Sequence, residues 1–313
     1  MISIGDIREA AERIAPYVHR TPVMTSRALD AMFGAEIYFK CENLQKVGAF
    51  KARGAVNAVM QLDVQQARAG VVTHSSGNHA QALAYAAGLR GLPCTIVMPH
   101  TAPSVKIEAV RGYGAKIVFC EPTLESRLHT MEEISQRTGA HVIPPYNDDR
   151  IMAGQGTVGL ELCEQVEGLD IVMAPVGGGG LLGGIATAVR AMQPSAWIIG
   201  AEPAIAADAK ESLETGSLQP PANSMTIADG LRTGLGDLTF VQLQAMGVEI
   251  VTASEESIRR GTLLVMERLK LVIEPSAGVT VGALLERPEL VSGRRVGIVL
   301  CGGNVDLSSL VFG

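Results

Sequence analysis

The chain has 313 residues, a formal net charge of −6, 47% hydrophobic residues and a mean hydropathy of +0.23. This composition can build a large core in one α/β unit or two sub-domains, and the acidic balance without a Lys/Arg block argues against nucleic-acid binding. The sequence has neither an apolar run of the ~18 residues that span a membrane nor a secretory leader, so we expect a cytoplasmic chain. Its five cysteines include no C-x-x-C pair, so we expect reduced thiols and no zinc site.

Short apolar runs alternate along the chain with helical patterns that end at Gly or Pro. The apolar runs predict buried strands at residues 35–42, 70–76, 94–99, 115–122, 140–146, 170–177, 196–203, 247–254 and 295–303. Helical spacing is seen at residues 78–91, 103–114, 128–139 and 183–194. Apolar strands separated by helices indicate parallel sheets covered on both faces, which bind ligands at the carboxyl ends of their strands. No linker or repeat divides the chain, so any second domain is interwoven with the first.

The segment "VGAFKARGAVNAVM" begins at Val47 and places Lys51 among small and apolar residues. A desolvated amine loses affinity for its proton, and the neutral amine is a nucleophile that forms Schiff bases with carbonyl groups. The alternative is a lysine at a helix start that lays its stem along apolar surface and keeps its charge in water. The segment by itself is compatible with both.

A strand-to-helix turn rich in hydroxyl and amide groups follows at "THSSGNHAQA". Ser75, Ser76, Gly77 and Asn78 could present backbone N–H groups to a carboxylate. The same residue types also form ordinary helix N-caps. The turn therefore indicates either a substrate site or a simple cap.

A second strand-to-helix turn, "PVGGGGLLGG", carries four successive glycines at residues 177–180. Glycine amides can approach an anion closely, and a helix N-terminus adds a favourable dipole. The spacing is neither G-x-G-x-x-G nor a Walker loop, which favours a single phosphate over a dinucleotide or a nucleoside triphosphate. A flexible turn is the alternative, although four glycines lose much conformational entropy on folding. Together with Lys51, the loop suggests pyridoxal phosphate, which carries one aldehyde and one phosphate.

Two further groups of residues lie at strand ends. The segment "GAEPAIAADA" holds Glu202 and Asp208, which could bind Mg²⁺ or Ca²⁺ with a backbone carbonyl between them. Two ordinary surface acids would give the same spacing. The segment "VLCGGN" places Cys301 at a strand end, where a thiol is usually a small buried residue. Opposite a pyridine nitrogen, this thiol would be only a weak partner.

Together these motifs resemble the fold-type II pyridoxal-phosphate enzymes, in the branch of the threonine/serine dehydratases and serine racemases. The similar segments cover nearly the whole chain and run in order from "TPVMTS" through "KCENLQKVGAFKARGA", "THSSGNHAQALAYAA", "MAGQGT", "PVGGGGLLGG", "ADGLRTGLGDLTF" and "LKLVIEPSAGVTVGALL" to "LCGGNVDL". The resemblance implies an α/β fold similar to tryptophan synthase β, with two interwoven open parallel-sheet domains and the cofactor in the cleft. It implies a large cofactor-binding domain at residues 1–47 and 147–313, a small domain at 48–146, and a homodimer or homotetramer.

The resemblance also implies a role for individual residues. Lys51 would be the Schiff-base lysine of pyridoxal 5′-phosphate, and Ser76 matches the serine that racemases use as proton donor on the opposite face. The implied cofactor contacts are Phe50, Lys51, Asn78, Gly177, Gly178, Gly179, Gly180, Leu181, Gly230, Glu274 and Cys301. The implied substrate contacts are Ser75, Ser76, Gly77, Asn78 and Arg127. Glu202, Ala206 (by its carbonyl) and Asp208 match the racemase site for Mg²⁺ or Ca²⁺.

The chain departs from the serine racemases at two positions. Cys301 stands where they usually carry serine, and Tyr146 stands where they carry an asparagine near the cofactor. Arg127 is retained and could meet an acidic group of the substrate. Since the sequence stops at Gly313, we do not expect the C-terminal regulatory domain of biosynthetic threonine dehydratases.

The expected reaction is β-elimination from L-threonine or L-serine to a 2-oxo acid and ammonia, with Lys51 as the base that removes the α-proton. threo-3-Hydroxyaspartate is an alternative substrate, because Arg127 or His74 could hold a second carboxylate. A serine racemase with side elimination is another alternative, because Ser76 could return the proton. A non-catalytic binding module for pyridoxal phosphate or an amino acid is the third, and the joint presence of Lys51, Asn78 and the glycines argues against it.

Overall fold

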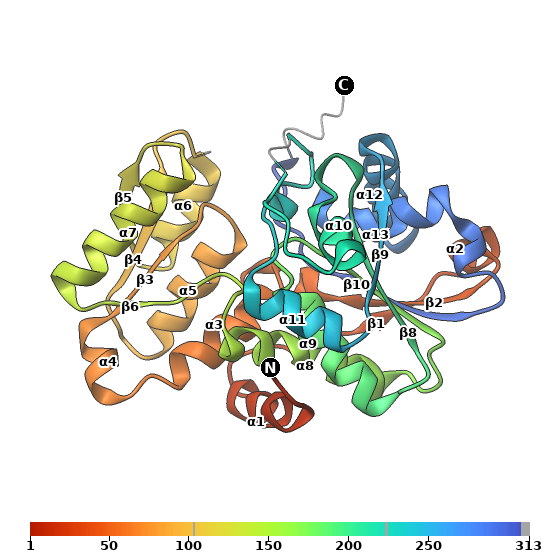
Figure 1. Cartoon of the computed structure of the whole chain (residues 1–313), viewed down its shortest axis with the longest axis horizontal. Coiled ribbons are helices and arrows are strands. Elements are labelled where there is room, and N and C mark those ends of the chain that lie inside the picture. The colour runs from red at the N-terminus through yellow and green to blue at the C-terminus, as the bar shows by residue number, and fades with distance from the viewer. Residues whose placement is uncertain (103, 223–224, 308–313) are drawn as a thin grey trace.

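Within residues 1–102, 104–222 and 225–307, which the computed structural model describes, the strands form one sheet of six and one of four (Figure 1). The larger sheet has the order β1 (Val23–Met24), β2 (Glu36–Cys41), β10 (Arg295–Leu300), β7 (Ile171–Pro175), β8 (Trp197–Pro203), β9 (Glu249–Ala253). The smaller has the order β5 (Lys116–Cys120), β4 (Cys94–Pro99), β3 (Val71–His74), β6 (His141–Val142). Every neighbouring pair is parallel except β1 and β2. The expected α/β fold with two open, essentially parallel sheets is confirmed.

Each predicted apolar run contains one of these strands, several strands are shorter than their runs, and one strand was not predicted. The run at 140–146 keeps only the two residues of β6, because Pro144 and Pro145 lack the N–H group that extends a ladder. The two-residue strand β1 carries no periodic pattern of its own. The smaller sheet lies between residues 71 and 142, inside the predicted small domain, and the boundaries at residues 48 and 147 remain a prediction.

Helices cover both sheets and carry the segments that follow the strands (Figure 1). The α-helices are α1 (Ile4–Ile14), α2 (Arg27–Phe33), α3 (Lys51–Met60), α4 (Val64–Ala69), α5 (Asn78–Leu89), α6 (Ser104–Gly112), α7 (Leu124–Thr138), α8 (Asp149–Gln165), α9 (Gly180–Met192), α10 (Asp208–Thr215), α11 (Asp237–Ala245), α12 (Glu255–Leu269) and α13 (Pro275–Glu286). The 3₁₀ turns are η1 (Glu42–Leu44), η2 (Lys46–Gly48), η3 (Ala204–Ala206), η4 (Asp229–Leu231) and η5 (Pro288–Leu290). Throughout the described ranges, no helix is both long and apolar enough to cross a membrane.

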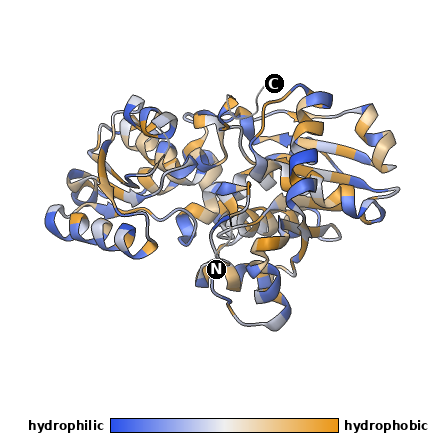
Figure 2. Ribbon diagram, turned by 90° about the horizontal axis from the view of Figure 1, so that it is seen from above, coloured by the Kyte–Doolittle hydropathy of each residue, from blue (hydrophilic) through white to orange (hydrophobic). Residues whose placement is uncertain are grey.

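Each sheet has its own apolar core, and the ribbon coloured by hydropathy shows the two lobes that contain them (Figure 2). The first core lies along β7, β8 and β10, and the second lies around α3, α5 and β4. Helices α3 and α8 touch through glycines, because a Cβ added to Gly154 would lie only 2.6 Å from the Cα of Gly54. This close packing fixes α3, whose first residue is Lys51.

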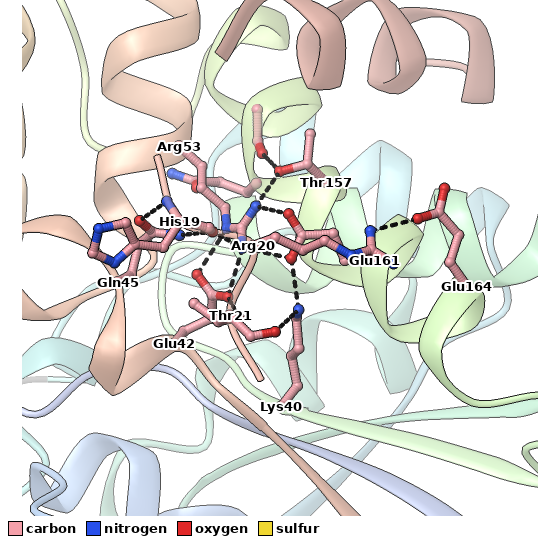
Figure 3. A network of polar contacts seen from close by, with 12 residues as sticks. His19, Arg20, Thr21, Lys40, Glu42, Gln45, Arg53, Thr157, Glu161 and Glu164 are labelled. Carbon is pink, nitrogen blue, oxygen red and sulfur yellow. Dashed lines mark hydrogen bonds and ion pairs between the residues drawn. The ribbon is translucent and has the colours of Figure 1, made fainter. Parts of the chain in front are cut away.

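A buried ion network also ties α3 to its neighbours (Figure 3). Arg53 donates to both carboxylate oxygens of Glu42 at 2.8 Å each, and to both oxygens of Glu161 at 2.7 and 2.9 Å. Lys40 donates to Glu161 at 2.6 Å. The side chains of Arg53, Lys40 and Glu42 are fully buried, and the two cations balance the two anions. Burial raises the pKa of Glu42, but Arg53 outweighs it and holds that pKa below its usual value.

Candidate active site

The turn that precedes α3 runs alongside the end of β10. Phe50 donates its backbone N–H to the carbonyl of Cys301 at 3.1 Å, and Ala49 pairs with Gly302. Gly303 donates to the carbonyl of Gly48 at 2.9 Å. Parallel pairing of β2 with β10 makes this contact possible, because it places the carboxyl ends of both strands at one edge of the sheet. The structure thereby brings the predicted residues Phe50, Lys51 and Cys301 together.

The amine of Lys51 points inward. Its Nζ donates to the carbonyl oxygen of Pro145 at 2.6 Å and lies 5.1 Å from the centre of the Phe50 ring. Burial lowers the pKa of Lys51 to about 8, while Cys301 and Glu274 oppose this shift. About a tenth of the amine is therefore neutral at pH 7, against less than about a thousandth for an ordinary lysine, and the neutral amine is the nucleophilic form.

Three predicted cofactor contacts meet at Glu274. The amide Nδ2 of Asn78, the first residue of α5, donates to both carboxylate oxygens of Glu274 at 3.0 Å. The thiol of Cys301 lies 4.0 Å from Glu274 Oε1. Burial raises the pKa of Glu274 to about 7 and raises the pKa of the Cys301 thiol. Gly230 joins this group, because its N–H donates to the hydroxyl of Ser276 at 3.0 Å at the start of α13.

The turn between β3 and α5 contains the predicted carboxylate-binding residues Ser75 to Asn78. The structure shows no side chain capping α5 at Gly77, and the hydroxyl of Ser75 instead accepts the N–H of Gly77 at 3.2 Å. Ser76 is half-buried in this turn. Since Gly77 has no side chain, no side chain occupies the N-terminus of α5 in the described structure, which leaves its first N–H groups available to a carboxylate.

The four glycines connect β7 to α9 in a closely covered loop. Gly179 has a φ of +84°, and a Cβ on Gly178 would lie 2.3 Å from the ring of Tyr146. The hydroxyl of Thr239 donates to the carbonyl of Gly178 at 2.8 Å and holds the loop. Gly177 and Gly180 flank the same turn, and Leu181 is buried in the first turn of α9. Only glycine fits positions 178 and 179, which leaves backbone amides free to approach an anion at a helix N-terminus.

These residues fit pyridoxal phosphate. A desolvated lysine matches its aldehyde, and a loop that admits only glycine matches its single phosphate. Pro145 and Tyr146 belong to the same site, although no sequence pattern indicates Pro145 and Tyr146 is predicted only as a departure from the serine racemases. A carbonyl acceptor has no side-chain signature, so no pattern could have indicated Pro145.

Arg127 lies on α7 with its side chain half-buried. Its Nε is buried and has no hydrogen-bond partner in the described part of the chain. Burial lowers the pKa of His74, and the nearby charge of Arg127 lowers it further. Since His74 ends β3, the Arg127 guanidinium lies near the turn that holds Ser75 to Asn78.

The predicted metal-binding acids are not surface residues. Glu202 and Asp208 are only 2% and 7% exposed, and Ala206 between them is also buried. Glu202 accepts the N–H groups of Lys210 and Ala209 at 2.8 and 3.2 Å at the start of α10. Burial raises the pKa of Glu202 to about 8. No cluster of three or more His, Cys, Asp or Glu side chains suited to a metal lies within the described ranges. Any cation here would therefore rely on two carboxylates and a carbonyl.

Comparison with known proteins places these features in a family. Residues 14–302 match the family described as pyridoxal-phosphate dependent enzyme. The chain is 48% identical to a beta-hydroxyaspartate dehydratase from Paracoccus denitrificans, with 97% of both chains covered. It is 45% identical to an L-threo-3-hydroxyaspartate ammonia-lyase from Saccharomyces cerevisiae, covering 97% of this chain and 93% of that one. The structure of maize serine racemase superimposes with a TM-score of 0.96 at 45% identity, covering 98% of this chain and 95% of that one.

Proposed function

The chain belongs to the pyridoxal-phosphate dependent enzymes, and we propose that it is a lyase that converts 3-hydroxyaspartate to a 2-oxo acid and ammonia. The observation that carries this proposal is the buried, unpaired Nε of Arg127 near the carboxyl end of β3. Arginine binds carboxylates through paired hydrogen bonds, and 3-hydroxyaspartate has a second carboxylate that serine and threonine lack. The two relatives named for hydroxyaspartate support the same substrate. L-Serine and L-threonine are then weaker substrates of the same site.

The residues of the site can be given definite tasks in this reaction. Backbone amides from Ser75 to Asn78 bind the α-carboxylate, and Arg127 binds the β-carboxylate. Lys51 Nζ takes the α-proton, which its lowered pKa allows near neutral pH. The β-carbon–oxygen bond then breaks with its electron pair going to oxygen, which takes up a proton and leaves as water. The enamine that is released adds water, and its carbon–nitrogen bond breaks to give the 2-oxo acid and ammonia. The cofactor would be held by the glycine loop, and by Lys51 until the substrate amine frees that lysine to act as the base, and it would supply the electron sink for the α-carbon.

Replacing Arg127 by alanine tests the substrate. We expect kcat/KM for 3-hydroxyaspartate to fall by about 10- to 100-fold, the cost of a lost hydrogen bond to a charged group. For L-serine, kcat/KM should stay within about threefold, because serine has no carboxylate for Arg127. Arg137, an exposed residue of the same helix, is the matched control, and Arg137→Ala should change neither value. Equal losses for both substrates would show that Arg127 does not select a second carboxylate.

We propose serine racemisation as a second activity of the same site, because half-buried Ser76 lies in the turn next to Asn78 and the fold closely matches maize serine racemase. In Ser76→Ala we expect D-serine formation from L-serine to fall by about 100-fold or more, the usual contribution of a general acid. Elimination from L-serine needs no proton on that face and should stay within about threefold. Chiral chromatography beside a 2-oxo acid assay measures both, and a parallel loss of both activities would contradict the assignment.

We also propose that Glu202, Asp208 and the carbonyl of Ala206 bind a divalent cation. Two buried acids without a cationic partner between them are costly, and Mg²⁺ or Ca²⁺ would relieve that cost. At a cation concentration 100 times its Kd, the free energy of unfolding should rise by about 2.7 kcal/mol. Thermal unfolding with and without EDTA measures this stabilisation. It should be lost in Glu202→Gln and kept in Glu214→Gln, which replaces an exposed acid of α10. An unchanged rise in Glu202→Gln would place the cation elsewhere.

A further inference from the structure

A chain of amide hydrogen bonds connects Asn304 to the cofactor site. The Nδ2 of Asn304 donates to the carbonyl of Val47 at 2.7 Å and to the Oδ1 of Asn78 at 2.9 Å. The Nδ2 of Asn78 in turn donates to both carboxylate oxygens of Glu274 at 3.0 Å. Four segments meet through these hydrogen bonds: the turn before Lys51, the start of α5, the residue that precedes α13 and the segment after β10.

The carbonyl of Val47 fixes which end of each asparagine amide donates and which end accepts in these hydrogen bonds. The two ends of an asparagine amide have nearly the same shape, so its partners decide which end is oxygen and which is nitrogen. The carbonyl of Val47 can only accept, so the NH₂ group of Asn304 must face it. That NH₂ group then meets the carbonyl oxygen of Asn78. The NH₂ group of Asn78 is therefore left facing Glu274.

Val47, whose carbonyl ends this chain of hydrogen bonds, has an unusual backbone conformation. Val47 has a φ of +56°, which is rare for a β-branched residue, and Gly48 follows with a φ of +69°. A Cβ on Gly48 would lie 2.6 Å from Oδ1 of Asn304, so only glycine lets the Asn304 side chain approach. The strained turn thus aims one carbonyl at Asn304, directly before the helix that begins with Lys51.

We propose that Asn304 is a positioning residue that keeps the NH₂ group of Asn78 turned toward Glu274 and the ring of the cofactor. Asn78 then meets the ring as a hydrogen-bond donor and cannot rotate to present its carbonyl oxygen. A donor stabilises negative charge on a ring oxygen, and an acceptor would repel it. This task is independent of the substrate, so it goes beyond the proposed elimination and holds for any amino acid that the site accepts.

The test compares Asn304→Ala with Asn304→Asp by titrating the cofactor-free protein with pyridoxal phosphate at pH 8. The measured quantities are the Kd of the cofactor and the ratio of its bound absorbance bands. Asn304→Ala frees the Asn78 amide and should raise the Kd by about 10-fold, one lost hydrogen bond. Asn304→Asp should raise it by about 100-fold or more, because a carboxylate cannot donate to Val47 and would turn the Asn78 amide around.

The ranking of the two variants decides between positioning and packing. Aspartate has nearly the shape of asparagine, so a residue that only fills space would tolerate aspartate better than alanine. A Kd for Asn304→Asp equal to or below that for Asn304→Ala overturns the proposal. In an Asn78→Ala background, Asn304→Ala should change the Kd by less than about twofold, because its partner is gone. A tenfold rise in the Kd in the Asn78→Ala background would also overturn the proposal. This second comparison replaces the first if Asn304→Asp does not fold.

Asn57 is the matched control for the loss of a well-bonded asparagine. On α3, its Nδ2 donates to the carbonyl of Arg150 at 2.6 Å and its Oδ1 accepts from Arg13 at 2.6 Å. Asn57→Ala should lower the thermal unfolding midpoint as Asn304→Ala does, yet leave the Kd of the cofactor within about twofold. A shift of the Kd in Asn57→Ala as large as in Asn304→Ala would mean that general loosening explains both, and the proposal would fail.

Discussion

Replacing Lys51 by alanine is expected to lower the rate of elimination by about 10³-fold or more, the largest loss among single substitutions in this site. Lys51 is expected both to bind the aldehyde of the cofactor and to remove the α-proton of the substrate, and no neighbouring residue can replace it in either task. Its amine donates to the carbonyl of Pro145, whose neighbour Tyr146 covers the glycine loop, and with a pKa of about 8 it can accept a proton near neutral pH. A stopped assay of 2-oxo acid formation measures the loss.

The variant Lys51→Arg distinguishes the positive charge of Lys51 from its ability to accept a proton. A guanidinium keeps the positive charge but stays protonated in proteins, so it can neither act as a base nor attack an aldehyde. We expect Lys51→Arg to be as inactive as Lys51→Ala and to lose the absorbance band of the lysine-bound cofactor. Lys116→Ala, at an exposed lysine of β5, should keep full activity. Substantial activity in Lys51→Arg would contradict the role of Lys51 as base.

Replacing Arg53 by methionine is expected to lower the free energy of unfolding by about 3–5 kcal/mol. Arg53 is fully buried and binds the carboxylates of Glu42 and Glu161, which would both lose a buried cationic partner. Chemical denaturation of the cofactor-free protein measures the change without interference from ligand binding.

The neighbouring pair Arg20–Glu164 provides the matched control (Figure 3). At 2.6 Å, this ion pair is as short as the buried Lys40–Glu161 pair, but its side chains are 54% and 42% exposed. Solvent screens it, so Arg20→Ala should change the free energy of unfolding by less than about 1 kcal/mol. If Arg53→Met cost no more than Arg20→Ala, the buried network would not be what holds α3 in place.

The regular parts of the fold could be predicted from the sequence because apolar periodicity reports burial directly. The strand ends could also be predicted to carry the site, since parallel strands collect their following residues at one edge. This is why the turns at Ser75–Asn78, at Gly177–Gly180 and at Cys301 were recognised as functional candidates. The glycine loop lies beside Cys301 because β7 pairs with β10, and the turn before Lys51 lies beside it because β2 pairs with β10, although these residues are far apart in the sequence.

Other features had no local signal. Lys40 and Glu161 look like surface charges in the sequence, because these two partners lie 121 residues apart, and Glu161 is also 108 residues from its other partner, Arg53. Asn304 ends an ordinary polar turn, and its importance arises only from the strained carbonyl of Val47. Glu202 and Asp208 were equally compatible with a wet surface until their burial was known.

The measurement that tests the account most directly is the specificity of the unmodified enzyme loaded with its cofactor. Incubated separately with the 3-hydroxyaspartate isomers, L-serine and L-threonine, it should release 2-oxo acid and ammonia in equal amounts. We predict that kcat/KM is highest for a 3-hydroxyaspartate isomer, by about 10-fold or more, since only that substrate pairs its second carboxylate with Arg127. Release of no 2-oxo acid from any of them, or a higher kcat/KM for serine or threonine, would contradict the account.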